Sequence, residues 1–121
     1  SFAEFHYLSK SSALFTFLHL AASPQLVEEL LTRRVTAIAY ETVDSGGALP
    51  ILRPMSEVAG ILSIQVGARG LEKGCGGRGV LLPGTGGSSP GEVTVLGAGV
   101  AGRNAARIAA GIVRPWGQIM L

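Results

Sequence analysis

The sequence predicts an α/β fold, and three observations support this prediction. Two short apolar runs with aromatic or β-branched members, at 13–18 and 36–40, flank a stretch whose apolar residues recur at helical spacing. A longer stretch, 55–72, also repeats apolar residues at helical spacing. Near the end of the chain, a β-branched run leads through a glycine-rich turn into a sequence typical of a helix, over 93–110.

The first half of the chain predicts a strand, a helix and a second strand. Ser23 and Pro24 suit the start of the helix, because serine can accept hydrogen bonds from free N–H groups and proline suits the first helical position. Short connections imply a parallel strand pair with a right-handed crossover. His19 and Glu41 follow the two strands, so we expect both at the sheet edge where α/β folds collect ligands. From position alone, His19 is open to a structural or a catalytic role, and Glu41 is expected to make a structural hydrogen bond.

The middle of the chain predicts a long helix that crosses between two lobes. Residues 49–54 are expected to be extended, since residues before a proline avoid the helical region, and Pro54 is expected to start a helix that runs to about Glu72. The predicted organisation is therefore the end of a first lobe at 1–53, a linking helix at 54–73 and the start of a second lobe at 74–121. The linking helix carries small residues that would let another element approach closely, namely Ala59, Gly60, Gly67 and Ala68.

The glycine-rich turn matches the G-x-G-x-x-G pattern of dinucleotide-binding folds in its proper context, after a strand and before a helix. Gly97 would allow the tight turn, Gly99 would let a pyrophosphate approach the backbone, and Gly102 would let the helix pack on the strand. The acidic residue expected about 20 residues later is absent, because 112–121 contains no Asp or Glu. The fold class is therefore α/β with incomplete Rossmann-like, doubly wound parallel sheets, in parts of two lobes. The alternative is a glycine-rich turn of another α/β fold.

Composition excludes several other classes of protein. The net charge of the 121 residues is +2, and Lys and Arg are scattered rather than clustered, so no nucleic-acid partner is expected. No apolar run is long enough for a membrane helix, and the N-terminus lacks the basic start of a signal peptide. The one cysteine, Cys75, lies between glycines and has no metal-ligand spacing around it. We expect a cytoplasmic protein without a metal site.

Four stretches together resemble bacterial alanine dehydrogenases. They are LFTFLHLA at 14–21, TAIAYETV at 36–43, PMSEVAG at 54–60 and GAGVAGRNAA at 97–106. The same family includes the nucleotide-binding α subunit of proton-translocating transhydrogenase, and LFTFLHLA favours the alanine dehydrogenase branch. The resemblance extends from about Phe15 to Gly111.

The resemblance implies a two-lobed enzyme that oxidises L-alanine to pyruvate and ammonium with NAD as hydride acceptor. It implies that His19 donates and accepts the proton at the substrate, that Ser56 contacts NAD, and that the parent enzyme is a homo-oligomer. The glycine turn would meet the pyrophosphate, with cofactor-binding residues Gly97, Gly99, Val100, Ala101 and Gly102.

The chain also departs from the family pattern. The family's substrate-binding Arg and Lys precede the matched region, and its ribose-binding and catalytic Asp residues follow it. We therefore expect a truncated or frame-shifted piece of an alanine dehydrogenase that is inactive alone, and the preference for NAD over NADP stays open. The alternatives are a piece of a transhydrogenase α subunit and a non-enzymatic interaction module.

Overall fold

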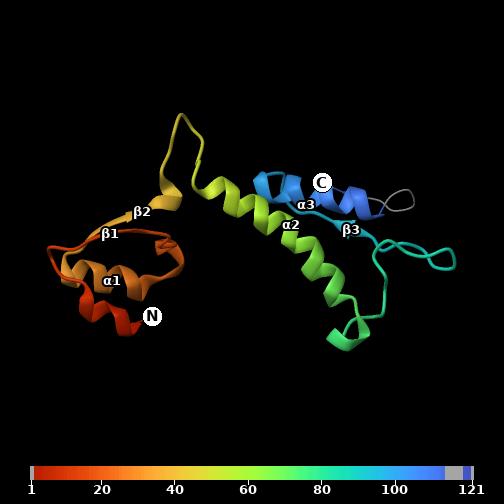
Figure 1. Ribbon diagram of the computed structural model, residues 1–121, viewed down its shortest axis with the longest axis horizontal. Helices are drawn as coiled ribbons and strands as arrows, with labels where there is room; N and C mark the ends of the chain where they lie inside the picture. The colour runs from red at the N-terminus through yellow and green to blue at the C-terminus, as the bar shows by residue number, and fades with distance from the viewer. Residues whose placement is uncertain (1, 114–118, 121) are drawn as a thin grey trace. The chain divides into compact units, whose positions relative to one another are not determined.

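The computed structural model describes residues 2–113 and 119–120, and the chain divides into two compact units, Ser1–Leu52 and Arg53–Leu121 (Figure 1). The observed helices and strands are those of an α/β protein, as the sequence predicts. The finer division into two lobes and a linking helix stays a prediction.

The first unit contains a parallel strand pair and one α-helix. Strand β1 (Ala13–Thr16) leads through the short 3-10 helix η2 (Leu20–Ala22) to helix α1 (Pro24–Arg33), and strand β2 (Thr36–Ala39) follows. The two strands pair in parallel from Ala13 opposite Thr36 to Thr16 opposite Ala39, so the predicted pairing is confirmed. The unit begins with η1 (Phe2–Tyr7) and continues after β2 into η3 (Tyr40–Thr42).

Backbone geometry rather than side-chain capping defines both ends of helix α1. Pro24 occupies its first position as predicted, but the prediction of a Ser23 side-chain cap is wrong. The ψ of Ser23 is 66°, outside the extended range from which a capping hydroxyl reaches the first turn, and only its carbonyl bonds to the helix, at 3.2 Å from the N–H of Val27. At the other end Arg34 adopts a left-handed conformation with φ 55°, and its N–H donates to the carbonyls of Leu30 and Leu31.

The second unit contains two helices and a short parallel strand pair. Helix α2 (Leu52–Gly70) is followed by η4 (Lys73–Cys75), strand β3 (Val93–Thr94), helix α3 (Val100–Val113) and strand β4 (Ile119–Met120). β4 pairs in parallel with β3, with Val93 opposite Ile119. The sequence did not predict β4. Pro115, a residue type that disfavours a central strand, lies outside the described residues.

Helix α2 begins two residues earlier than predicted, so the expectation of an extended chain up to Pro54 is wrong at Leu52 and Arg53. A proline in the first turn of a helix is tolerated because the N–H it lacks would have no partner inside the helix. The end of the helix at Gly70 lies close to the predicted Glu72.

The core of the second unit forms where α2, β3 and α3 meet. A Cβ atom built on Gly60 of α2 would overlap the backbone carbonyl oxygen of Ala101 in α3, and it would lie 3.0 Å from the Cβ of Asn104. The expectation that small residues of α2 admit a close neighbour is therefore confirmed at Gly60. The buried apolar residues of this core are Ile64, Leu82, Val95, Ala105, Ala109 and Val113.

A second apolar stripe follows α2 at helical spacing and is exposed. We call it the α2 stripe, and its side chains keep between 38% and 69% of their surface accessible. The stripe consists of Met55, Val58, Leu62 and Val66. By helical geometry it lies opposite the face that carries Gly60 and Ile64. Within the described residues, no helix combines the length and the apolar character needed to cross a membrane.

Candidate functional site

His19 lies at the carboxyl end of β1, in the first unit, as the sequence predicts. It is exposed, and its backbone is left-handed, with φ 45° and ψ 47°. This conformation costs a residue with a Cβ about 1–2 kcal/mol, so the surrounding structure must hold it. The imidazole is stacked against the ring of Phe17, with ring centroids 5.9 Å apart and planes 15° from parallel.

Glu41 provides the support for this turn. Its side chain is buried, and one carboxylate oxygen accepts the N–H of His19 at 2.8 Å and that of Leu18 at 3.2 Å. The second oxygen lies 3.3 Å from the Leu18 nitrogen. The expectation that Glu41 shares a sheet edge with His19 and makes a structural hydrogen bond is confirmed.

The hydrogen bonds decide the ionisation of Glu41. Burial raises the pKa of its carboxyl, but the N–H groups of His19, Glu41 itself and Leu18, together with the charge of the His19 side chain, lower it by more. The net pKa lies below the ordinary value of 4.5, so Glu41 is a carboxylate at neutral pH.

An aromatic cluster continues from Phe17, the ring stacked on His19, and sequence reasoning missed it. Tyr40 lies with its ring centroid 6.4 Å from that of Phe17 and 5.5 Å from that of Phe15. The signal was available in the sequence, because positions 15 and 17 alternate along the strand expected at 13–18 and would share one face. His19 therefore borders an apolar wall, and Phe15 of that wall is 60% exposed.

The glycine turn of the second unit has the geometry expected of its three glycines. Gly97 has φ 108°, which residues with a Cβ rarely adopt. A Cβ on Gly102 would overlap the carbonyl oxygen of Gly97, so this position requires glycine for the helix to approach the turn. A Cβ on Gly99 would meet nothing within 4 Å, which leaves open space at this backbone.

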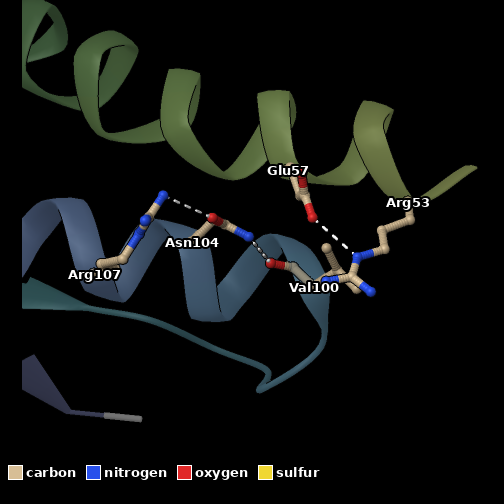
Figure 2. A network of polar contacts seen from close by, with 5 residues as sticks. All are labelled: Arg53, Glu57, Val100, Asn104 and Arg107. Carbon is tan, nitrogen blue, oxygen red and sulfur yellow. Dashed lines mark hydrogen bonds and ion pairs between the residues drawn. The ribbon is translucent and has the colours of Figure 1, made fainter.

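Helix α3 begins directly after the turn (Figure 2). The carbonyl of Gly99 accepts the N–H of Arg103 at 3.0 Å, and the side chain of Asn104 donates to the Val100 carbonyl at 2.9 Å. Arg107 donates in turn to Asn104 at 3.2 Å, so these contacts fix the first turns of the helix. The first N–H groups of a helix have no acceptor within it, and they carry the positive end of the helix dipole. Val100 and Ala101 present such groups.

Ser56 lies on α2, in the same unit as the glycine turn. It is half-buried and one helical turn before Gly60, so it shares the face of α2 that contacts Ala101 of α3. Its neighbour Glu57 pairs with Arg53 at 3.0 Å (Figure 2). The Arg53 side chain is 70% exposed. Exposed pairs of this kind contribute little to stability. The structure thus brings Ser56 and the turn residues into one unit, while His19 belongs to the other.

Within the part of the chain that the structure describes, no group of three or more His, Cys, Asp or Glu side chains gathers in one place. Cys75 is exposed, at the end of η4. The chain carries two candidate sites, the His19 turn in the first unit and the glycine turn in the second.

The fold and the glycine turn define a Rossmann-like α/β protein. Comparison with known proteins identifies the family, because models of two domains of one family match successive parts of the chain. Residues 1–59 match the N-terminal domain of alanine dehydrogenase/PNT, and residues 63–114 match the C-terminal domain. The chain belongs to the alanine dehydrogenase/PNT family.

Individual relatives agree with this assignment. The chain is 55% identical over 109 residues to the alanine dehydrogenase of Bacillus subtilis and 57% identical over 110 residues to that of Mycolicibacterium smegmatis. Both matches cover 90% of this chain, and they cover 29% and 30% of the relatives. A solved L-alanine dehydrogenase structure matches with a TM-score of 0.77 and 53% identity, over 92% of this chain and 31% of that one. The chain thus spans about 30% of the length of its relatives.

Proposed function

We propose that this chain supplies the proton-transfer histidine and the first nucleotide-binding turn of an NAD-dependent L-alanine dehydrogenase. The reaction converts L-alanine, NAD⁺ and water into pyruvate, ammonium, NADH and a proton. The observation that carries the proposal is the glycine turn, in which Gly97 has positive φ, Gly102 contacts the turn backbone and Gly99 faces open space.

The residues of the turn suit a dinucleotide pyrophosphate. Gly99 leaves free the volume that a Cβ would fill, and the N-terminal N–H groups of α3 at Val100 and Ala101 offer donors to an anion. We assign Gly97 and Gly102 to the shape of the turn and Ser56 to a contact with the cofactor. NAD bound there would accept the hydride from the α-carbon of L-alanine.

The role of His19 in this proposal is proton transfer. The imidazole is exposed at the end of β1, where it can reach a substrate, and its backbone turn is held by Glu41. A ring nitrogen would take up a proton as the substrate is oxidised and return it in the reverse reaction. The rings of Phe17 and Tyr40 would limit access of water from one side.

The proposal is tested in a chimera, because the chain spans only about 30% of its relatives. The matching residues of this chain replace the homologous 109-residue segment of the Bacillus subtilis alanine dehydrogenase, and NADH formation from L-alanine is followed by absorbance. We expect activity in the chimera and a loss of about 10²–10⁴-fold in kcat for His19→Gln. The matched control His6→Gln, outside the turn, should leave kcat unchanged.

A second pair of variants tests the glycine turn. Gly99→Ala should weaken NAD binding at least about tenfold, since the new methyl group occupies the space of the pyrophosphate. Gly111→Ala places its methyl group in equally open space at the far end of α3 and should leave binding unchanged. An active chimera that tolerates both His19→Gln and Gly99→Ala would refute the proposed roles. Hydride transfer between nucleotides without L-alanine would favour the transhydrogenase alternative.

We propose that the chain alone gives no turnover, that it acts in the cytoplasm, and that the parent enzyme is a homo-oligomer. NADH formation from L-alanine by the purified chain would overturn the first of these. Co-expression with a full-length relative would test the alternative of an interaction module, and failure to co-purify would end it.

A further inference from the structure

The end of β1 contains a carboxylate that is bound by two consecutive amides. The N–H groups of Leu18 and His19 both point to the carboxylate of Glu41, with N–O distances of 3.2 Å and 2.8 Å to the same oxygen. Glu41 reaches them from η3, at the end of the neighbouring strand, and retains 8% of its surface. Successive backbone N–H groups that converge in this way form an anion-binding concavity. Here the chain fills the concavity with its own side chain.

The residue held by this carboxylate, His19, also has an unusual backbone conformation. His19 combines φ 45° and ψ 47°, which is uncommon for a residue with a Cβ. The conformation directs the chain into η2, and the imidazole lies stacked on Phe17, two residues earlier. A left-handed residue that is not glycine persists only where its surroundings fix it, and the Glu41 carboxylate accepts the N–H of His19 itself.

The contacts also separate two possible roles for Glu41. A carboxylate that assisted proton transfer directly would bond to an imidazole nitrogen, as in serine protease triads. The hydrogen bonds described for Glu41 instead come from backbone N–H groups. Through its hydrogen bonds Glu41 therefore acts on the backbone of His19, and its charge adds a coulombic interaction with the His19 side chain.

We propose that Glu41 is a positioning residue, whose carboxylate fixes the left-handed turn at His19 and thereby orients the imidazole. The inference rests on the proposed role of His19 in proton transfer. It adds a consequence for ligands, because removing the Glu41 side chain would expose an anion site that a small carboxylate can refill.

The first experiment uses the full 121-residue chain labelled with ¹⁵N-histidine, which gives amide signals for His6 and His19 alone. We expect Glu41→Ala to accelerate exchange of the His19 amide proton by about 10–100-fold, the range set by hydrogen bonds to charged groups. Added formate should slow this exchange again. Exchange at His6 and in the control variant Glu28→Ala, whose substitution lies on α1, should not change.

Glu41→Gln covers the case in which Glu41→Ala does not fold. The amide side chain keeps one oxygen acceptor but no charge, so exchange at His19 should accelerate by a smaller factor while the circular dichroism of the helices is retained. Unchanged exchange at His19 in a folded Glu41 variant would overturn the proposal. So would exchange in Glu41→Ala that formate does not slow.

The second experiment uses the chimera and separates this inference from the proposed function. Glu41→Gln should lower kcat with L-alanine at least about tenfold while KM for NAD and the stoichiometry of NAD binding stay constant, and Glu28→Gln should change none of them. A merely structural role would instead lower the fraction of sites that bind NAD. A chimera without alanine dehydrogenase activity would refute the proposed function, while the exchange experiment would still decide the role of Glu41 in the turn.

Discussion

The contact between α2 and α3 allows a paired test of the packing. Gly60 and Gly67 both lie inside α2, yet a Cβ on Gly60 would overlap the carbonyl oxygen of Ala101, whereas a Cβ on Gly67 would meet nothing within 4 Å. Replacing a glycine inside a helix by alanine favours the helix by about 1 kcal/mol. Gly67→Ala should therefore raise the free energy of unfolding by about 0.5–1 kcal/mol.

Gly60→Ala should have the opposite effect. The obstacle is backbone on a packed helix rather than the end of a flexible side chain, and Asn104 Cβ adds a second contact at 3.0 Å. Overpacking of this kind costs about 1–3 kcal/mol, which cancels or exceeds the helix gain. Both variants share the gain in helix propensity. The difference between their free energies of unfolding, about 1–3 kcal/mol, therefore measures the cost of the contact with Ala101.

The assay is urea unfolding of each purified variant, followed by far-UV circular dichroism. The unfolding midpoint should rank Gly67→Ala above the parent chain and Gly60→Ala at the bottom. If Gly60→Ala proved as stable as Gly67→Ala, the close approach of α3 to α2 would be refuted, together with the explanation of Gly60 as a packing residue.

Three further predictions concern the turns. Arg34→Gly should stabilise the chain by about 0.5–1 kcal/mol in urea unfolding, because glycine adopts the φ of 55° at this helix end without strain; a destabilised variant would contradict this. Gly97→Ala should lower the free energy of unfolding by about 1–3 kcal/mol, since alanine does not tolerate a φ of 108°, and an unchanged unfolding midpoint would show that the turn relaxes. Because the pKa of Glu41 is lowered, its carboxylate contributes fully to the free energy of unfolding above pH 4.5. This contribution is lost as the pH falls from 4.5 through the lowered pKa. Glu41→Gln should remove this loss of stability at low pH. If the free energy of unfolding of the variant changed with pH as that of the parent chain does, the prediction would be wrong.

The sequence predicted the elements that depend on local patterns. Apolar runs around an amphipathic helix were sufficient for the parallel pairing of β1 with β2, and this topology placed Glu41 beside His19. The glycine spacing likewise predicted a tight turn at Gly97, where φ is positive, and the close packing at Gly102.

Features that depend on the rest of the structure were missed. The left-handed backbone of His19 has no local signal, because it is maintained by a carboxylate 22 residues away. The early start of α2 was missed because the restriction that Pro54 places on Arg53 is a preference, which the helix overrides. The capping role given to Ser23 failed because its backbone leaves the extended region.

The α2 stripe has a consequence for the temperature dependence of stability. Unfolding normally raises the heat capacity by about 1.5–1.8 kcal/mol/K for 121 residues, mainly because apolar surface becomes hydrated. The side chains of Met55, Val58, Leu62 and Val66 already contact water over 38–69% of their surface. That portion is already hydrated in the folded chain, so the heat capacity change should be smaller than for a protein of equal length whose helix is covered. The free energy of unfolding then varies less steeply with temperature, and cold weakens this chain less than it weakens a protein of equal length with a covered helix.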